Sequence, residues 1–499
     1  MARLWQLGVQ EVRPGTYFRT SSGDVTTEGA INGIVAVVYA DNWGALNEVV
    51  DISPEEMNNL RDIVGDGAGY NAVYQAFLGG ALTVRAVRVG TGGTRPYVNL
   101  YSSDVTTSTG SKAGALRVYA KYPSDRTFKV SVGNDLITGY KKLTIYEGDR
   151  IVESFSVARG TKEAYRMYKA IHDNGKNFTA KYLCKKADGS NNTVCKLENY
   201  TQRSFKAGTG TNPTTNVSAF SAGLDILERY DWNVIISSSN NAGVHSLLTA
   251  YVAQCYENGR FGMAVIGGLT TDPLTDSTSG GRMEYAAALN DWRVVYVLGG
   301  WKGTDGQSYG GYKAAARIAG MIAGCESNAS ITHLVISGAF KPLEDLTNGQ
   351  MIQAEQSGCL VLSPNEDGQV WVDNAINTLV TLNNDQDAGW RKIRRTKCRF
   401  ELMSRVNRTV DKLIGRLNND AAGRATVLTA MTTIIREMIA ERKLFEGSYA
   451  EEDSRYVPSG DKAFFILHIG DIDSLEKCYI TYEFSYANPY AELDVATTG

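Results

Sequence analysis

Helical and strand patterns alternate five times between residues 219 and 362, and this alternation constrains the fold more than any other feature. The strand segments are apolar throughout, as Phe261–Ile266 and Trp292–Leu298 show. Strands without a polar face are buried on both sides, and helices between them indicate a parallel sheet. The expected helices are 219–230, 242–257, 283–289, 312–323 and 351–355, and the expected strands 232–237, 261–266, 292–298, 333–336 and 359–362. The sequence therefore predicts an α/β domain over residues 217–372.

Residues 30–96 form a smaller α/β part before this domain. Ile31–Ala40 is a continuous apolar strand, and Ser53 with Glu56 makes a capping box for a helix. A second helix is expected near 70–78 and a strand over 82–89. Residues 1–29 are polar and irregular, and we expect an N-terminal arm there with one short strand.

A β-rich insert is predicted between these parts, over residues 97–216. Its strands are short and separated by turn signals, with one helix at Lys162–His172. Stretches rich in Gly, Ser and Thr mark both of its boundaries.

Residues 373–475 are predicted to form an α+β domain. Two amphipathic helices, 398–417 and 425–444, precede a strand at 462–469. A basic run comes just before the first helix and contains Arg391, Lys392, Arg394, Arg395 and Lys397. Such a run has two interpretations: a solvated surface, or a patch that docks onto an acidic partner and sets its register.

The segment 477–486 alternates with period 2 and predicts a strand near the start of a C-terminal arm, 476–499. Cys478, Ile480, Tyr482, Phe484 and Tyr486 share one face. A terminal strand needs a sheet edge, which its own subunit or a neighbouring one can supply. The pattern alone leaves both possibilities open.

Composition gives no sign of a nucleic-acid or membrane partner. The net charge of the 499 residues is -3, and no stretch is long and apolar enough for a signal peptide or a membrane span. Seven widely spaced cysteines are typical of reduced thiols made in a cytoplasm.

Catalytic and cofactor motifs are missing from the sequence. It contains no phosphate-binding glycine loop and no G-x-S-x-G elbow, and its four histidines have no local metal-ligand spacing. Asp231 precedes His245 in the order that some hydrolases use. We expect no catalytic residue, no cofactor and no metal, although an α/β enzyme remains an alternative.

The whole chain resembles the contractile tail sheath proteins of bacteriophages and of phage-derived contractile bacteriocins. The resemblance rests on five stretches in order: Arg13–Phe18, Gly33–Val38, Asp41–Gly44, Gly79–Val89 and Glu476–Phe484. None is specific alone, but together they extend over almost all of the chain.

The resemblance implies a subtilisin-like α/β domain without a catalytic triad, a β-sandwich-like insert, and a C-terminal domain that faces a tail tube. It also implies stacked hexameric rings in a helical sheath that contracts from a metastable extended state. Tyr17 and Phe18 in one arm, and Cys478, Ile480, Tyr482 and Phe484 in the other, would be the strands exchanged between subunits. The basic run at 391–397 or the helices after it would contact the tube.

The implied partners are further copies of the chain, a tail tube protein, and baseplate and tail-terminator proteins. The chain would be made in the cytoplasm of a bacterial host and become part of a virion tail or a phage-tail-like particle. The alternatives are a degenerate subtilisin-like hydrolase, a nucleotide-binding protein, or another self-assembling tail or shell protein.

Overall fold

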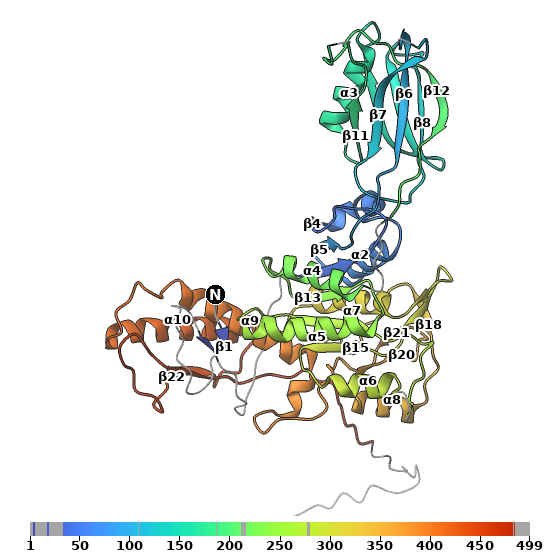
Figure 1. Cartoon of the computed structure of the whole chain (residues 1–499). Helices are drawn as coiled ribbons and strands as arrows, with labels where there is room; N and C mark the ends of the chain where they lie inside the picture. The colour runs from blue at the N-terminus through green and yellow to red at the C-terminus, as the bar shows by residue number, and fades with distance from the viewer. Residues whose placement is uncertain are drawn as a thin grey trace, which may run out of the picture.

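The computed structural model describes residues 33–107, 109–186, 188–210, 216–276, 280–482 and 484, with the backbone of two short strands at 3–4 and 17–18. An α/β body forms the centre, a β-rich insert projects from it, and a helical C-terminal part lies at its side (Figure 1). Within these residues, no helix has the length and apolarity needed to cross a bilayer.

A seven-stranded sheet forms the centre of the body. Its strand order is β19 (Cys359–Leu360), β15 (Val294–Val297), β14 (Met263–Gly267), β13 (Val234–Ser237), β3 (Ile34–Tyr39), β5 (Thr83–Arg88) and β4 (Val49–Ile52). All neighbours are parallel except β4 and β5. Every residue of β13, β14 and β15 is buried, which confirms the prediction of strands covered on both faces.

Residues 30–96 and 217–372 contribute to this one sheet, although the sequence suggested two successive parts. Val35 pairs with Val234 and Val38 with Ser237, so β3 and β13 are neighbours at the centre. The insert follows β5 in the sequence, and the chain re-enters the body at α4 (Val217–Leu227). Hydrophobic periodicity predicts where each strand lies, but it does not predict which strands pair across a long insertion.

Helices cover both faces of the sheet. Buried side chains of α2 (Ala68–Gly79) and α7 (Tyr312–Gly324) pack on one face, and those of α4 (Val217–Leu227), α5 (Ala242–Glu257), α6 (Arg282–Leu289) and α8 (Asn348–Gln356) on the other. Helices α2 and α7 approach closely, because a Cβ added to Gly320 would lie 2.0 Å from the carbonyl oxygen of Ala76.

Smaller elements complete the body. They are η1 (Pro54–Asn59), α1 (Leu60–Val64), a ribbon of β16 (Trp301–Gly303), β17 (Ser308–Tyr309) and β18 (Ala339–Pro342), and the pair β20 (Leu362–Pro364) and β21 (Val370–Val372). The capping box of Ser53 and Glu56 is present at the start of η1. The predicted strand 333–336 is wrong: Val335 makes one isolated bridge to Trp371, and His333 has a positive φ of 59°.

The insert is a two-layer β structure with one helix. One sheet has the order β10 (Arg150–Val157), β9 (Lys141–Glu147), β8 (Lys129–Asn134) and β12 (Tyr200–Ser204), and the other the order β11 (Phe178–Tyr182), β7 (Lys112–Ala120) and β6 (Tyr97–Thr106). Helix α3 (Glu163–Asn174) packs mainly against β10 and β11. The predicted β-rich insert with one helix is therefore present.

Trp43 connects the body to the insert. Its side chain is buried in the core of the insert, with ring centroids 5.4 Å from Tyr122 and 5.7 Å from Phe128. Arg126 of the insert lies 4.6 Å from the Trp43 ring centroid and donates to the carbonyl oxygen of Arg61 in α1, and the Arg61 guanidinium lies 3.2 Å from the carboxylate of Glu147 in the insert. The insert is thus held against the body by a buried aromatic contact and an ion pair, and not by its linkers alone.

The C-terminal part consists of two helices and a two-stranded sheet. After η2 (Ala388–Arg391) come α9 (Ile393–Asp411), α10 (Ala421–Ala440), β22 (Tyr449–Glu452) and β23 (Phe465–His468). Val406 and Val410 of the predicted apolar stripe pack with Met431 and Ile435 in a separate core. Helix α9 begins five residues before the predicted start, so most of the basic run is helical.

Candidate assembly interface

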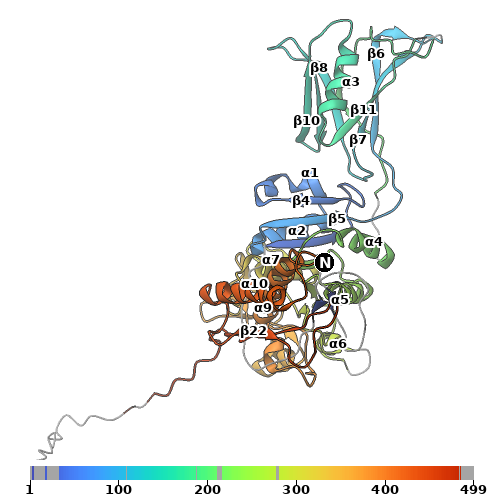
Figure 2. The same ribbon diagram turned by 90° about the vertical axis from the view of Figure 1, so that its left-hand side faces the viewer.

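The C-terminal segment predicted as a strand is an extended, exposed chain without a partner strand. Residues 477–482 and 484 form no strand, and Tyr479 and Phe484 are 91% and 93% exposed. Ile480 and Tyr482 are also exposed, as is Cys478. Figure 2 shows the segment running away from the body. Residues 483 and 485–499, with Tyr486, lie outside the described part of the chain.

A strand needs hydrogen-bonding neighbours, and no strand of the described residues is paired with this segment. This explains why the alternating pattern does not appear as a strand. The segment exposes four large apolar or aromatic side chains to water, and burying each would stabilise the protein by about 1.5–3 kcal/mol. They are Tyr479, Ile480, Tyr482 and Phe484.

The N-terminal arm contains the short strand that the sequence predicted. β2 (Tyr17–Phe18) pairs in parallel with β1 (Arg3–Leu4), with Tyr17 opposite Arg3 and Phe18 opposite Leu4. The other residues of the predicted arm, including Arg13–Thr16, lie outside the described residues.

The sheet of β22 and β23 has two open edges within the described chain. Tyr449 pairs with His468 and Glu452 with Phe465, and no third described strand joins them. Phe465 and Leu467 pack against the core of α9 and α10, while all four residues of β23 stay half-buried. A two-stranded sheet is marginal by itself, so this hairpin can accept further strands.

Helix α9 holds the base of the C-terminal arm. The Asp471 carboxylate, 4% exposed, pairs with the guanidinium of Arg395 and lies 3.5 Å from that of Arg399. Arg394 donates to the carbonyl oxygen of Ile472, and Lys392 pairs with Glu476. We call Lys392, Arg394, Arg395, Arg399, Asp471 and Glu476 the arm anchor.

The body supplies further partners for this anchor. The hydroxyls of Ser330 and Thr332 donate to Glu476 at 3.3 and 3.2 Å. Burial raises the pKa of Asp471, and its arginine partners oppose that rise. The arm is therefore fixed up to Glu476 and leaves the protein surface after that residue.

The basic run is not an exposed face, which corrects one of the sequence-based interpretations. Arg394, Arg395 and Lys397 are buried, and Arg391 donates to the carbonyl oxygen of Glu355. Lys397 donates from Nζ to the carbonyl oxygen of Cys325, and burial lowers its pKa to about 8. The acidic surface that this run docks onto is largely the base of the chain's own arm.

The residues considered for hydrolysis do not meet. His245 is buried with Nε2 3.3 Å from the carbonyl oxygen of Ser239, and burial lowers its pKa to about 4. Asp231 is exposed and lies 3.8 Å from Arg260. Among the described residues, no group of three His, Cys, Asp or Glu side chains is placed to hold a metal ion.

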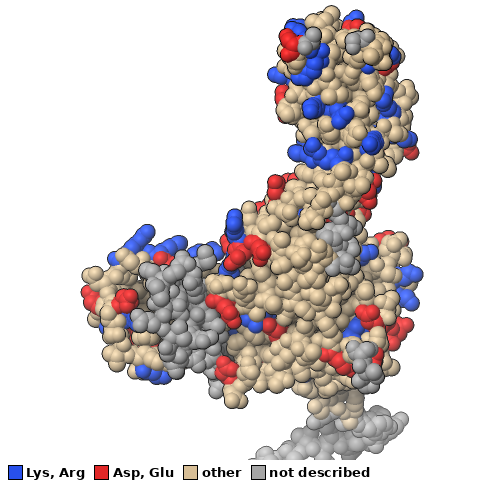
Figure 3. Space-filling view, in the orientation of Figure 1, with Lys and Arg blue, Asp and Glu red and all other residues tan. Residues whose placement is uncertain are grey.

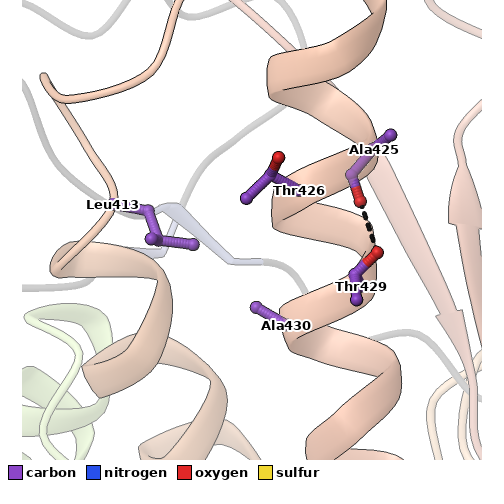
Figure 4. Close-up of a pocket in the computed structure, with 5 residues that line it drawn as sticks. All are labelled: Leu413, Ala425, Thr426, Thr429 and Ala430. Carbon is purple, nitrogen blue, oxygen red and sulfur yellow. Dashed lines mark hydrogen bonds between the residues drawn. The ribbon is translucent and has the colours of Figure 1, made fainter.

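A shallow depression lies between the end of α9 and helix α10 (Figure 4). Leu413 faces Thr426 and Ala430 across it, and Ala425 and Thr429 complete its lining. The hydroxyl of Thr429 donates to the carbonyl oxygen of Ala425. No ionisable side chain lines this depression, so it has none of the groups that acid–base or nucleophilic catalysis requires.

Residues 214–378 match the sequence model of a family described as the phage tail sheath protein central domain. No protein among those with curated descriptions matches the chain. The fold is similar to that of a sheath tail protein from Desulfitobacterium hafniense, with 17% identity, 93% of this chain and 99% of the other covered, and a TM-score of 0.63.

Two further solved structures have a similar fold. A sheath tail protein from Listeria innocua is 18% identical, with 90% of this chain and 96% of the other covered and a TM-score of 0.62. A chain of the anti-feeding prophage helical sheath in its contracted state is 11% identical, with 96% and 100% covered and a TM-score of 0.51. The similarity includes the body, the insert and the C-terminal part.

Proposed function

We propose that this chain, whose residues 214–378 match the phage tail sheath protein central domain, is the structural subunit of a contractile tail sheath. One observation is central to the proposal. Residues 477–482 and 484 are an exposed segment with the side-chain alternation of a strand, and the described chain also contains a two-stranded sheet with open edges. A subunit that lacks a strand partner and offers a strand acceptor is suited to polymerisation.

Strand exchange between neighbouring copies would join the subunits. In this proposal Cys478, Ile480, Tyr482 and Phe484 enter the β22–β23 sheet of another copy, and the N-terminal strand with Tyr17 and Phe18 contributes a second link. Residues 477–484 extend about 26 Å when fully stretched, enough to reach a neighbour in contact with the body. Main-chain hydrogen bonds would supply affinity, and the alternating side chains the register.

The arm anchor gives this exchange a fixed starting point. Because Asp471 is bound to Arg395 of α9 and Glu476 to Lys392 just before that helix, the unanchored length begins at Lys477 and not at the end of β23. A short tether raises the effective concentration of the strand near its acceptor and limits which neighbours it reaches.

Contraction would then proceed by rigid-body rotation of subunits while the exchanged strands stay paired. Hexameric rings would stack around a tail tube, held in a metastable extended state, and would pack more tightly when a baseplate releases them. The tube protein, the baseplate and a tail terminator are the proposed partners, and neither a cofactor nor a metal takes part. The particle would be a phage tail or a phage-tail-like injection device, with its subunits made in the host cytoplasm.

We further propose that the α/β body is a subtilisin-like fold that has no catalytic role. The separation of His245 from Asp231 supports this view over the alternative of a degenerate hydrolase. The tube surface would be formed by residues other than the buried Arg394, Arg395 and Lys397.

Electron microscopy of the full-length protein expressed alone tests the proposed function. Sixfold-symmetric rings or cylinders are expected at high protein concentration. A strictly monomeric protein under all assembly conditions would contradict it.

A further inference from the structure

Opposite charges are segregated along this chain. Residues 97–216, the insert, contain 19 Lys and Arg against 10 Asp and Glu. The two segments of the α/β body, 33–96 and 217–372, together contain 12 Lys and Arg against 22 Asp and Glu. The nearly neutral total conceals a strongly basic insert on a strongly acidic body.

The outer face of the β6–β7–β11 sheet combines cations with tyrosines. On β6 the side chains of Tyr97 and Tyr101 point outward, because the intervening Val98 and Leu100 are buried in the insert core. β7 and β11 contribute the rest of the sheet face, and β12, which belongs to the other sheet, adjoins it where Arg203 lies 5.2 Å from the Tyr101 ring centroid. We define the basic face as Arg95, Tyr97, Tyr101, Arg117, Tyr119, Lys181, Tyr200, Arg203 and Lys206.

Cation–π contacts hold the cations of this face in place. The guanidinium of Arg117 lies 4.7 Å from the Tyr97 ring centroid, and that of Arg203 lies 4.7 Å from the Tyr200 centroid. Arg95 lies 5.1 Å from the Tyr119 centroid, and Lys206 Nζ lies 5.7 Å from that of Tyr97. Arginine and tyrosine arranged in this way are typical of the energetically dominant residues of protein interfaces.

The same contacts argue against a sugar or nucleic-acid base as the ligand. Such ligands stack on free aromatic faces, whereas here the chain's own cations occupy a face of these rings. Glu198, which accepts a hydrogen bond from the Tyr200 hydroxyl, adjoins the face, but the cations of the face outnumber this one carboxylate. This excess of positive charge fits the carboxylates of a folded protein surface.

The chain's own body does not neutralise this face. The insert projects from the body, and the β6–β7–β11 face is directed sideways and not down onto it (Figures 1 and 3). Lys and Arg outnumber Asp and Glu on this side of the insert in Figure 3. The insert is attached to the body at its base, by Trp43 in the insert core and by the hydrogen bond from Arg126 to the carbonyl oxygen of Arg61.

We propose that the basic face of the insert docks onto the acidic α/β body of a second copy of this chain. The two surfaces have opposite charge, and both occur in every subunit, so each copy offers one and accepts the other. The inference builds on the proposed polymerisation and adds a second contact, distinct from strand exchange. Because both surfaces are exposed, this contact should weaken strongly with salt.

Sedimentation velocity of the full-length protein at 50 and 500 mM NaCl tests the proposal. The variant Lys181→Glu/Arg203→Glu/Lys206→Glu reverses the face at partly or fully exposed positions. Its self-association constant at 50 mM NaCl should fall about tenfold or more, with little remaining salt dependence. The control Lys129→Glu/Lys142→Glu/Lys162→Glu makes the same change in net charge elsewhere on the insert and should retain wild-type association. Lys181→Gln/Arg203→Gln/Lys206→Gln gives a milder version if the reversal impairs folding.

Carbodiimide cross-linking of mixed unlabelled and 15N-labelled protein identifies the docking partner. Lys181 or Lys206 should become joined to carboxylates in residues 33–96 or 217–372 of the other copy. Wild-type association of the reversed variant, or cross-links only to other regions, would overturn the inference. So would loss of binding to heparin, used as a polyanion probe, with unchanged self-association, since the face would then serve an anionic polymer.

The experiments distinguish failure of the docking inference from failure of the proposed function. If the wild-type protein forms cylinders and the reversed variant associates normally, only the docking inference fails. If no cylinders form at all, the sheath proposal fails, and the association constants and cross-links still decide the docking inference.

Discussion

Arg395 and Asp471, 76 positions apart in sequence, form a buried ion pair that joins the first turn of α9 to the base of the C-terminal arm. Asp471 also lies 3.5 Å from the guanidinium of Arg399 and is only 4% exposed. Removing one partner from such a group leaves a buried charge uncompensated, which is usually more costly than the pair is stabilising.

Asp471→Asn is therefore expected to lower the free energy of unfolding by about 2 kcal/mol, less than for an isolated buried pair because Arg395 also contacts Asp387. The substitution should also loosen the arm, so that proteolysis near Glu476 becomes faster. Urea unfolding and limited proteolysis measure the two effects. Asp473→Asn is the matched control, because Asp473 is 43% exposed and 3.9 Å from Arg394. Equal effects of the two substitutions would refute the anchor.

Tyr482→Pro should abolish or strongly reduce polymer formation, since proline removes a ladder hydrogen-bond donor from the exchanged strand. The folded monomer should keep its thermal stability, because Tyr482 is 72% exposed there. Sedimentation of the assembled fraction is the measurement. Tyr482→Phe preserves the backbone donor and most of the ring and should still assemble. Polymer of wild-type amount from the proline variant would place the intersubunit strand elsewhere.

Trp43→Ala should destabilise the junction between body and insert by about 3–5 kcal/mol, as for other large buried aromatic side chains. Arg126 would also lose the ring that it covers. We expect faster protease cleavage around residues 90–96 and a separate unfolding transition for the insert. Tyr140→Ala, at a half-exposed position of the insert, should change neither. A single unchanged unfolding transition would show that the linkers alone hold the insert.

Buried His245 predicts a pH dependence of stability. Its folded pKa of about 4 lies below the ordinary 6.5, so the unfolded chain binds more protons between these values. Stability should fall as the pH decreases from 6.5 to 4, with about 3 kcal/mol from this residue. Chemical unfolding across this range should give a shallower slope for His245→Asn than for the wild type. The same slope in both proteins would contradict the assignment.

Local sequence patterns predicted the helices and central strands of the body well. Helix α5 occupies the predicted 242–257, and the apolar strands near 234, 263 and 294 are buried on both faces. In these segments the hydrophobic pattern of the sequence matches the burial of the residues in the structure. The segment 333–336 is also mainly apolar, but it lies beside β21, where Val335 bridges Trp371, and β19 occupies the position beside β15.

Contacts between distant segments were not accessible from these patterns. In the sequence, the basic run has the composition of a surface patch. Its partners Asp471 and Glu476 cannot be recognised from local patterns, because they lie about 75 to 85 positions later in the chain. The sequence also gives no signal for the start of the helix at Ile393, because Lys392, at the N-cap position, makes no side-chain capping hydrogen bond. The alternation at 477–486 predicts a strand, whereas residues 477–482 and 484 form none in the single chain.

In the proposed sheath, the segment after the arm anchor links one subunit to the next. Negative-stain electron microscopy of full-length protein and of a chain ending at Glu476 tests this directly, because the shorter chain keeps all anchor contacts. We expect ringed cylinders from the full-length protein and only folded, soluble subunits from the shorter chain. Cylinders of normal length from the shorter chain would contradict the proposed link.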